Sequence, residues 1–133
     1  MAQHTIPESH RDLLDGEFAT MATVGEDGYP HLSEVWFVTE GDRIALSLNT
    51  ARQKVKNLET EPNCTLLILD LANPYRYLEI RGRADVEPDP DLEFARTVGA
   101  KYGSDLAVHD APGDRRVVVR IMPARVRAVD MSG

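Results

Sequence analysis

The sequence predicts an α+β protein whose six or seven antiparallel strands close into a small Greek-key barrel with short flanking helices. Apolar and polar residues alternate with a period of two over several short segments, most clearly from Tyr75 to Val86. Short turns such as Gly25-Glu26-Asp27-Gly28 connect neighbouring segments, which is typical of hairpins. Apart from a short helix near the N-terminus, helices are expected only after the third and fifth strands. Strands and helices therefore do not alternate as a parallel β-α-β fold requires.

The first half of the chain is expected to contain a short helix and three strands. Pro7 lies at or near the first turn of this helix, and Gly16 ends it. Threonines and apolar residues interleave in the segment that follows, and Gly and Asp mark the turns between segments. The three strands are expected at 18–24, 29–38 and 43–48.

The second of these strands has two unlike faces. Side chains alternate across a strand, so every second residue points to the same side. Neither face is purely apolar, as expected for a strand that lines a barrel on one side and meets a ligand or partner on the other. The two faces are His31, Ser33, Val35 and Phe37, and Leu32, Glu34, Trp36 and Val38.

The second half is expected to contain the remaining strands and one further helix. The continuous apolar run from Cys64 to Leu69 predicts a central strand covered on both sides. Gly82 interrupts the strand over 75–86 and indicates a bulge or the close approach of another backbone. The other elements are a helix over 89–102 closed by Gly103, a polar loop over 104–114, and strands over 115–122 and 125–129 separated by Pro123.

Composition limits the classes of function. With 133 residues the chain is expected to form one domain, 1–133. The net charge of −7 argues against nucleic acid or an anionic membrane as the main partner. No apolar run approaches the roughly 20 residues that span a bilayer. The segment Met1 to Arg11 lacks a signal-peptide pattern, so a cytoplasmic location is expected.

Several kinds of catalytic chemistry have no motif in this sequence. The patterns of zinc proteases, thiol redox proteins, serine hydrolases and P-loop proteins are absent. The single cysteine, Cys64, lies in an apolar run and is expected to be a small buried hydrophobe rather than a nucleophile. No metal site is predicted, because the histidines lack the spacing of metal ligands. They are His4, His10, His31 and His109.

Positive charge gathers where a strand is expected to give way to a helix, within 47–58. Thr50 is expected to be the helix N-cap. Arg52, Lys54 and Lys56 then place cations near the positive end of the helix dipole, which costs about 0.3–1 kcal/mol each. Free N–H groups and clustered cations together favour an anion, most naturally a phosphate. The alternative is a solvated basic face screened by nearby glutamates.

A second candidate segment follows the Asn73-Pro74 loop. Tyr75, Arg76 and Tyr77 bring two aromatic rings and a guanidinium together, and these could stack on or border a flat ligand. The alternative is an ordinary aromatic pair on an edge strand. Trp36 is compatible with a core position, a subunit interface or a ligand wall.

Three segments carry a resemblance to a known family: D-G-Y-P-H-L-S-E-V-W at 27–36, R-Q-K-V-K-N-L-E-T-E-P at 52–62, and N-P-Y-R-Y-L-E-I-R-G at 73–82. In this order and spacing they resemble the split β-barrel flavoproteins related to pyridoxamine 5′-phosphate oxidase. More narrowly, they resemble the F420-dependent (deazaflavin) reductases of that family. The resemblance extends over nearly the whole chain. It implies an FMN-binding type of split barrel and a homodimer with each cofactor in a groove between the two barrels.

The resemblance also implies roles for individual residues. The basic segment would hold the phosphate and acidic tail of the cofactor through Arg52, Lys54 and Lys56. The strand before it would supply backbone and hydroxyl contacts, and the strand over 29–38 would lie near the ring system. The third segment would border the cofactor site. The residues in these three groups are Ser47, Leu48, Asn49 and Thr50; His31, Ser33 and Val35; and Tyr75, Arg76 and Tyr77.

The function expected from the resemblance is that of an F420H2-dependent reductase, which transfers a hydride to a small conjugated acceptor. Oxidation of vitamin B6 is not expected, because the chain shows no counterpart of the C-terminal substrate-binding extension of pyridoxamine 5′-phosphate oxidase. Two alternatives remain at this point. One is an FMN-dependent oxidoreductase of the same fold, and the other is a non-catalytic carrier of F420 or a flavin. No catalytic residue is assigned from the sequence.

Overall fold

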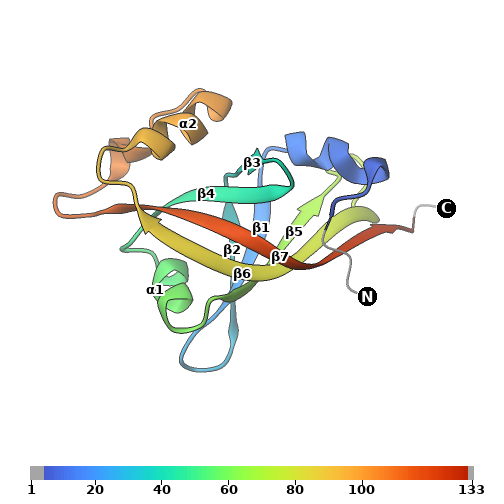
Figure 1. Cartoon of the computed structure of the whole chain (residues 1–133), viewed down its shortest axis with the longest axis horizontal. Coiled ribbons are helices and arrows are strands. Elements are labelled where there is room, and N and C mark those ends of the chain that lie inside the picture. The colour runs from blue at the N-terminus through green and yellow to red at the C-terminus, as the bar shows by residue number, and fades with distance from the viewer. Residues whose placement is uncertain (1–4, 132–133) are drawn as a thin grey trace.

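The computed structural model describes residues 5–131, and His4 lies outside this range. Its seven strands form one antiparallel sheet in the order β2-β1-β5-β6-β7-β4-β3 (Figure 1). The strands are β1 (Ala19–Val24), β2 (Pro30–Val35), β3 (Val38–Glu40), β4 (Arg43–Asn49), β5 (Asn63–Leu69), β6 (Arg76–Pro88) and β7 (Arg116–Asp130). The helices are α1 (Gln53–Thr60), α2 (Glu93–Tyr102) and the 3₁₀-helices η1 (Glu8–Asp15) and η2 (Leu106–His109).

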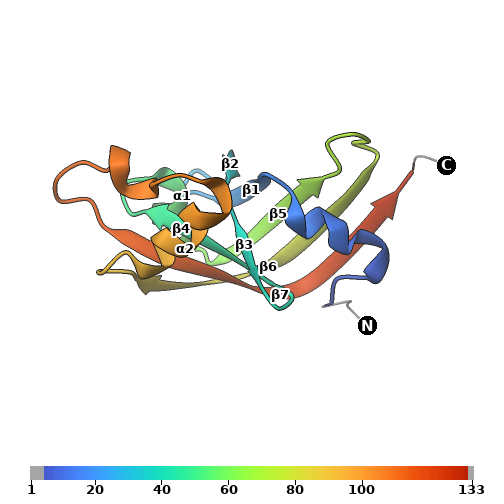
Figure 2. The same cartoon turned by 90° about the horizontal axis from the view of Figure 1, so that it is seen from above.

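The predicted α+β class and the Greek-key arrangement of antiparallel strands are confirmed. After β4 the chain passes through α1 and forms β5, β6 and β7 as neighbours, and β7 returns to lie beside β4. Within residues 5–131 the edge strands β2 and β3 share no ladder, so the curled sheet stays open between them. This is the split barrel that the resemblance implies. Figures 1 and 2 place α2 and η2 at one end of the molecule and η1 at the other.

The prediction of one strand over 29–38 is wrong, because the chain leaves the sheet at Trp36 and Phe37. Phe37 is completely buried, and its backbone bonds to the end of α2 instead of to a strand. Its N–H donates to the Tyr102 hydroxyl at 3.1 Å, and its carbonyl accepts from Tyr102 and from Lys101 Nζ. Trp36 stacks on Tyr102 with ring centroids 4.2 Å apart. This crossover carries the chain from one edge of the sheet to the other.

The prediction of two strands separated by Pro123 is also wrong, because β7 is continuous. Arg81 pairs with Arg125 and Gly82 with Pro123, so Ala124 is the extra residue of a β-bulge. A proline fits at a bulge because the ladder there does not need its missing N–H. The bulge predicted from Gly82 is confirmed.

The predicted start of the second helix needs a correction. Thr50 is not the N-cap; its N–H donates to the carbonyl of Arg115, and α1 begins at Gln53 with Arg52 as N-cap. No side chain of the described residues caps α1; Asn49 Oδ1 instead accepts the N–H of Ala51 at 2.8 Å in the turn before the helix. The loop predicted over 104–114 contains the short helix η2.

The core lies on the inner face of the sheet, where Met21, Leu66 and Ile80 are buried. α1 covers part of this face with Val55 and Leu58. The central place of β5 is confirmed, but only its inner face is buried in the chain. On its outer face the side chains are half-exposed, which corrects the expectation of cover on both sides. They are Thr65, Leu67 and Leu69.

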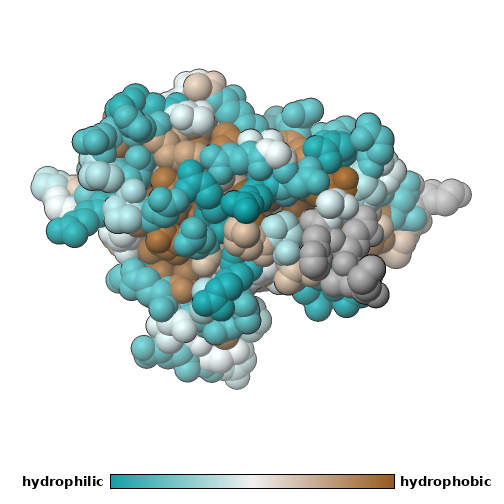
Figure 3. Space-filling view, in the orientation of Figure 1, coloured by the Kyte–Doolittle hydropathy of each residue, from teal (hydrophilic) through white to brown (hydrophobic). Residues whose placement is uncertain are grey.

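The outer surface over β6 and β7 is largely hydrophilic, with smaller hydrophobic areas between the polar side chains (Figure 3). Arg120 of β7, for example, forms ion pairs with Glu40 and Glu87. Within residues 5–131 no helix has the length and apolar character needed to cross a membrane.

We predict that Gly82→Ala destabilises the fold by about 2–3 kcal/mol, the upper part of the usual range for overpacking. A Cβ at this position would lie 2.5 Å from the backbone oxygen of Met122 and 2.7 Å from Ile121 Cγ2. Gly41→Ala is the control, because nothing lies within 4 Å and only its positive φ of 63° is strained. Its cost should be about 1 kcal/mol. Urea unfolding measures both, and an equal cost for the two variants would contradict the packing argument.

Candidate functional site

The side chains of Lys54 and Ser33 join α1 to β2. Lys54 Nζ donates a hydrogen bond to Ser33 Oγ at 2.8 Å. Ser33 lies on the inner face of β2, where it pairs with Met21 of β1. Lys54 points toward this face because it shares the buried side of α1 with Leu58 four residues later. Two residues that the sequence assigned to a cofactor site therefore meet in one place.

The ammonium of Lys54 is half-buried and has no carboxylate partner. Among the ion pairs of residues 5–131, none includes Lys54. Burial lowers the pKa of Lys54 below its ordinary value, and the nearby charge of Arg52 lowers it further. A buried charge is costly unless it is paired, and the hydroxyl of Ser33 compensates only part of that cost. An anion bound here would supply the missing counter-charge.

The beginning of α1 adds hydrogen-bond donors beside this ammonium. Val55 and Lys56 donate their N–H groups to the carbonyl of Arg52. For the N–H groups of Gln53 and Lys54, no acceptor is found in the described part of the chain. Unpaired N–H groups at a helix N-terminus favour an anion. The donors and the Lys54 ammonium thus favour the same kind of ligand.

The three cations of the basic segment do not point in one direction. Residues two apart on a helix face different sides. Lys56 accordingly lines a groove of about 560 Å³ between α1 and the β1–β2 hairpin, whereas Lys54 points to Ser33. The groove also contains His31, whose Nδ1 is buried and finds no hydrogen-bond partner among residues 5–131. Asn57 lies beneath it, donating to Thr23 and accepting from the Gln53 amide.

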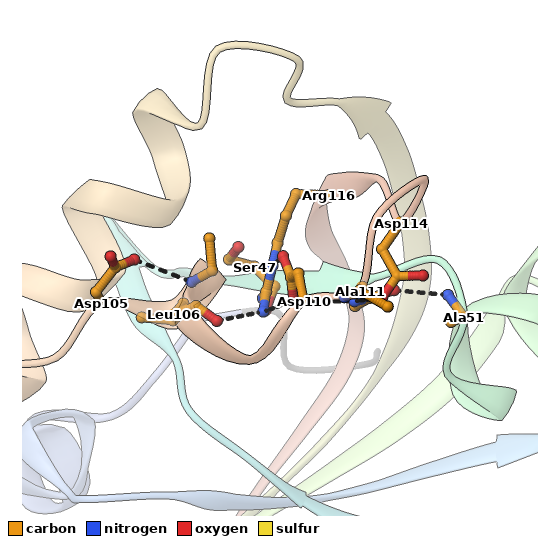
Figure 4. Close-up of polar contacts among 10 residues, drawn as sticks. Ser47, Ala51, Asp105, Leu106, Asp110, Ala111, Asp114 and Arg116 are labelled. Atoms are coloured by element: carbon orange, nitrogen blue, oxygen red, sulfur yellow. Dashed lines mark hydrogen bonds and ion pairs between the residues drawn. The ribbon is translucent and has the colours of Figure 1, made fainter.

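The end of β4 is fixed by a polar network beneath η2 (Figure 4). Asn49 Nδ2 donates to Asp110 Oδ1 at 3.0 Å and to Asp114 Oδ2 at 2.9 Å. Asp110 forms a two-oxygen ion pair with Arg116. Arg116 also donates to the carbonyl oxygens of Ser47 and Leu106. The side chain of Asn49 is therefore fully engaged in holding the loop over 110–114.

Other residues of the predicted set have structural roles in this chain. Ser47 is 6% exposed, and its buried hydroxyl has no hydrogen-bond partner in the described part of the chain. Val35 and Leu48 belong to the hydrophobic core. The backbone of Thr50 bonds to Arg115. Within 47–50, the side chain of Asn49 bonds to the loop over 110–114 and to the turn that leads into α1.

The aromatic segment lies apart from the Lys54–Ser33 contact within one chain. Tyr77 pairs with Leu69 on the outer face of the sheet, and three strand spacings, about 14 Å, separate β6 from β2. The Arg76 guanidinium is bound by Asp12 and Asp70 and by the carbonyl of Ser9. Tyr75 is 62% exposed. A single chain thus does not bring this segment to the beginning of α1.

Sequence reasoning missed two features of the site. Gln53 and Asn57 form one wall of the groove, and their spacing of four residues, which places them on one side of a helix, is a local signal that could have indicated them. Asp110 and Asp114 lie near the same turn only because β7 pairs with β4. No pattern in the sequence marks that proximity.

Cys64 is buried, and burial raises the pKa of its thiol to about 12. A thiol with this pKa remains protonated near neutral pH, and the thiolate is the reactive form. The prediction of a structural cysteine is confirmed.

Comparison with protein-family models matches residues 6–130 to pyridoxamine 5′-phosphate oxidase. The chain belongs to the pyridoxamine 5′-phosphate oxidase family. Solved structures of similar fold include an F420 reductase with 32% identity and a TM-score of 0.80, covering 92% of this chain and 98% of that one. No curated protein matches the chain by sequence.

Two further solved structures are similar to this chain. A conserved hypothetical protein from Mycobacterium tuberculosis has 27% identity and a TM-score of 0.74, covering 98% of this chain and 88% of that one. A putative pyridoxamine 5′-phosphate oxidase from Listeria innocua has 23% identity and a TM-score of 0.67, covering 87% and 90%. The latter supports the fold alone.

We predict that Ser47→Ala leaves cofactor affinity unchanged and stabilises the fold by up to about 1 kcal/mol. The substitution removes a buried hydroxyl for which the described residues offer no hydrogen-bond partner, and such groups are costly. Thermal unfolding and a cofactor titration of the same preparation measure the two quantities. A loss of affinity at unchanged stability would instead assign the hydroxyl to the cofactor, as the family resemblance implies.

Proposed function

We propose that this protein is an F420H2-dependent reductase that acts on a small conjugated acceptor. The observation that carries the proposal is the half-buried ammonium of Lys54, which has no carboxylate partner among residues 5–131. It lies beside N–H groups at the start of α1 for which the same residues offer no acceptor. These donors suit a phosphate, which F420 and FMN both possess. The similarity to a structure named F420 reductase favours the deazaflavin.

The groove between α1 and the β1–β2 hairpin supports F420 over FMN as the cofactor. FMN ends at its phosphate, whereas F420 continues into an acidic tail. A ligand whose phosphate lies at Lys54 would continue along α1, into the groove that Lys56 and His31 line. Glu26 and Asp27 border the same groove, so the cation there faces a mixed charge environment. Lys56 is accordingly proposed to bind the tail and Lys54 the phosphate.

The bound deazaflavin would supply the hydride, and the protein would supply orientation and exclusion of water. The chain's own residues have definite tasks in this scheme. Lys54 and Arg52 neutralise the phosphate, and the α1 N–H groups fix its position. Ser33, which accepts from Lys54, directs its own proton toward the ligand. His31, Ser33 and Val35 lie along the strand that would approach the ring. No residue is assigned as the proton donor.

The active form is proposed to be a homodimer in which the partner contributes to each site. Leu67, Leu69 and Tyr77 are half-exposed on the outer face of the sheet, where apolar side chains favour a partner surface. The family resemblance assigns Tyr75, Arg76 and Tyr77 to the border of the cofactor site, and one chain cannot bring them to Lys54. A second copy could supply them.

The competing function is FMN-dependent oxidation or reduction at the same site, which the family match supports. The preference of the protein for F420 or for FMN distinguishes the two functions. A non-catalytic carrier would bind the reduced cofactor tightly, and no acceptor would reoxidise it.

We predict that Lys54→Ala weakens binding of F420 by about tenfold to a hundredfold, the range expected for a lost charge-assisted hydrogen bond. Quenching of the fluorescence of Trp36 provides the titration, and added salt should weaken binding by the wild type. The matched control is Arg43→Ala, which removes the same charge at the far end of β4. Equal affinity of Lys54→Ala and wild type would overturn the assignment of the phosphate site.

We predict a mass of twice 14.8 kDa by sedimentation equilibrium. Leu67→Arg should shift the protein toward the monomer and weaken F420 binding, because a charge would be buried between the two sheets. Val108→Arg is the control, since Val108 is 64% exposed on η2. A monomeric wild type that binds F420 normally would rule out a shared site.

A further inference from the structure

The polar network beneath η2 contains a carboxylate whose charge is not neutralised by an ion pair among the described residues. Asp110 is paired with Arg116, and both of its oxygens accept hydrogen bonds from that guanidinium. Asp114 has no ion pair in the part of the chain that the structure describes. Only its Oδ2 is engaged, accepting from Asn49 Nδ2 at 2.9 Å and from the N–H of Ala111 at 2.9 Å.

A neutral amide could make the same two bonds. The side-chain oxygen of an asparagine accepts as the Asp114 Oδ2 does, and no bond is found for Asp114 Oδ1 within residues 5–131. The geometry of the loop therefore requires an acceptor at this position but not a charge. The reason for the negative charge of Asp114 must therefore be sought in the neighbouring residues.

Asn49 connects Asp114 to Arg52, a cation of the basic segment. Asn49 bonds to Asp114 through its side chain and accepts the N–H of Arg52 through its carbonyl at 3.0 Å. The hydrogen bond from Asn49 lowers the pKa of the Asp114 carboxyl, as does the N–H of Ala111, and the charge of Arg52 contributes in the same direction. Asp114 is thus ionised near neutral pH beside the cation that precedes α1. Arg52 itself forms no ion pair with another described residue.

We infer that Asp114 is an affinity-determining residue that weakens the binding of phosphate-bearing ligands at the start of α1. A fixed negative charge repels an incoming dianion and offsets part of the field of Arg52. The ligand is consequently held less tightly and exchanges with the solution more readily. This inference rests on the phosphate site proposed above, and it concerns a residue that makes no contact with Lys54 or Ser33.

The test compares wild type with Asp114→Asn by titration with F420, FMN and riboflavin at low and high salt. Asp114→Asn should bind F420 and FMN about three- to tenfold more tightly at low salt, as expected for a screened like charge removed from the neighbourhood of a dianion. The gain should shrink at high salt. Riboflavin, which has no phosphate, should show no gain.

Asp105→Asn is the matched control. Asp105 is also a carboxylate that accepts a backbone N–H beside η2, at 3.1 Å from Ala107, and the substitution changes the net charge equally. It should leave all three affinities unchanged, because it lies away from the start of α1 (Figure 4). A thermal melt confirms folding of each variant. If Asp114→Asn fails to melt cooperatively, Asp114→Ser removes the same charge and keeps an acceptor oxygen.

Salt-dependent binding by wild type with no gain in either Asp114 variant would overturn this inference and leave the proposed phosphate site standing. An equal gain in Asp105→Asn would also overturn it, because the effect would then be one of net charge. If neither wild type nor Asp114→Asn bound F420 or FMN, the proposed function and the inference would fall together.

Discussion

The fold depends on how the chain crosses from one edge of its sheet to the other at Trp36 and Phe37. Phe37 is buried outside any ladder, so its backbone polar groups would be costly without the bonds from Tyr102 and Lys101. The end of α2 therefore holds the crossover in place. Because the crossover separates β2 from β3, the barrel stays split, and the inner face of β2 is left for α1 to meet. The contact between Lys54 and Ser33 is a consequence of that arrangement.

Much of the fold could be predicted, because alternation and turn residues are local signals. The bulge at Gly82 could be predicted for the same reason, because a glycine within a strand is a local signal. The break after Val35 was not, since Trp36 and Phe37 continue the strand pattern and the bonds that remove them come from residue 102. Pro123 led to the opposite error, a break predicted within a strand that is continuous. A proline usually ends a regular strand, but it fits the bulge opposite Gly82. Both errors arise from distant partners that override a local pattern.

The candidate site likewise has features that the sequence predicts and features that it does not. A basic helix start beside a strand was predictable from Arg52, Lys54 and Lys56, but their directions were not, since helix geometry turns Lys54 inward and Lys56 toward the hairpin. Asn49 was assigned to the cofactor from resemblance, and the structure engages its side chain with Asp110 and Asp114. These acidic residues come from a loop about sixty residues away.

The central claim is that the start of α1 binds the phosphate of a deazaflavin cofactor. The most direct test is a crystal structure of the protein with F420 bound. We expect the phosphate within hydrogen-bond distance of Lys54 Nζ and of the N–H groups of Gln53 and Lys54, with the tail in the groove beside Lys56. A phosphate bound elsewhere, with Lys54 still bonded only to Ser33, would contradict it.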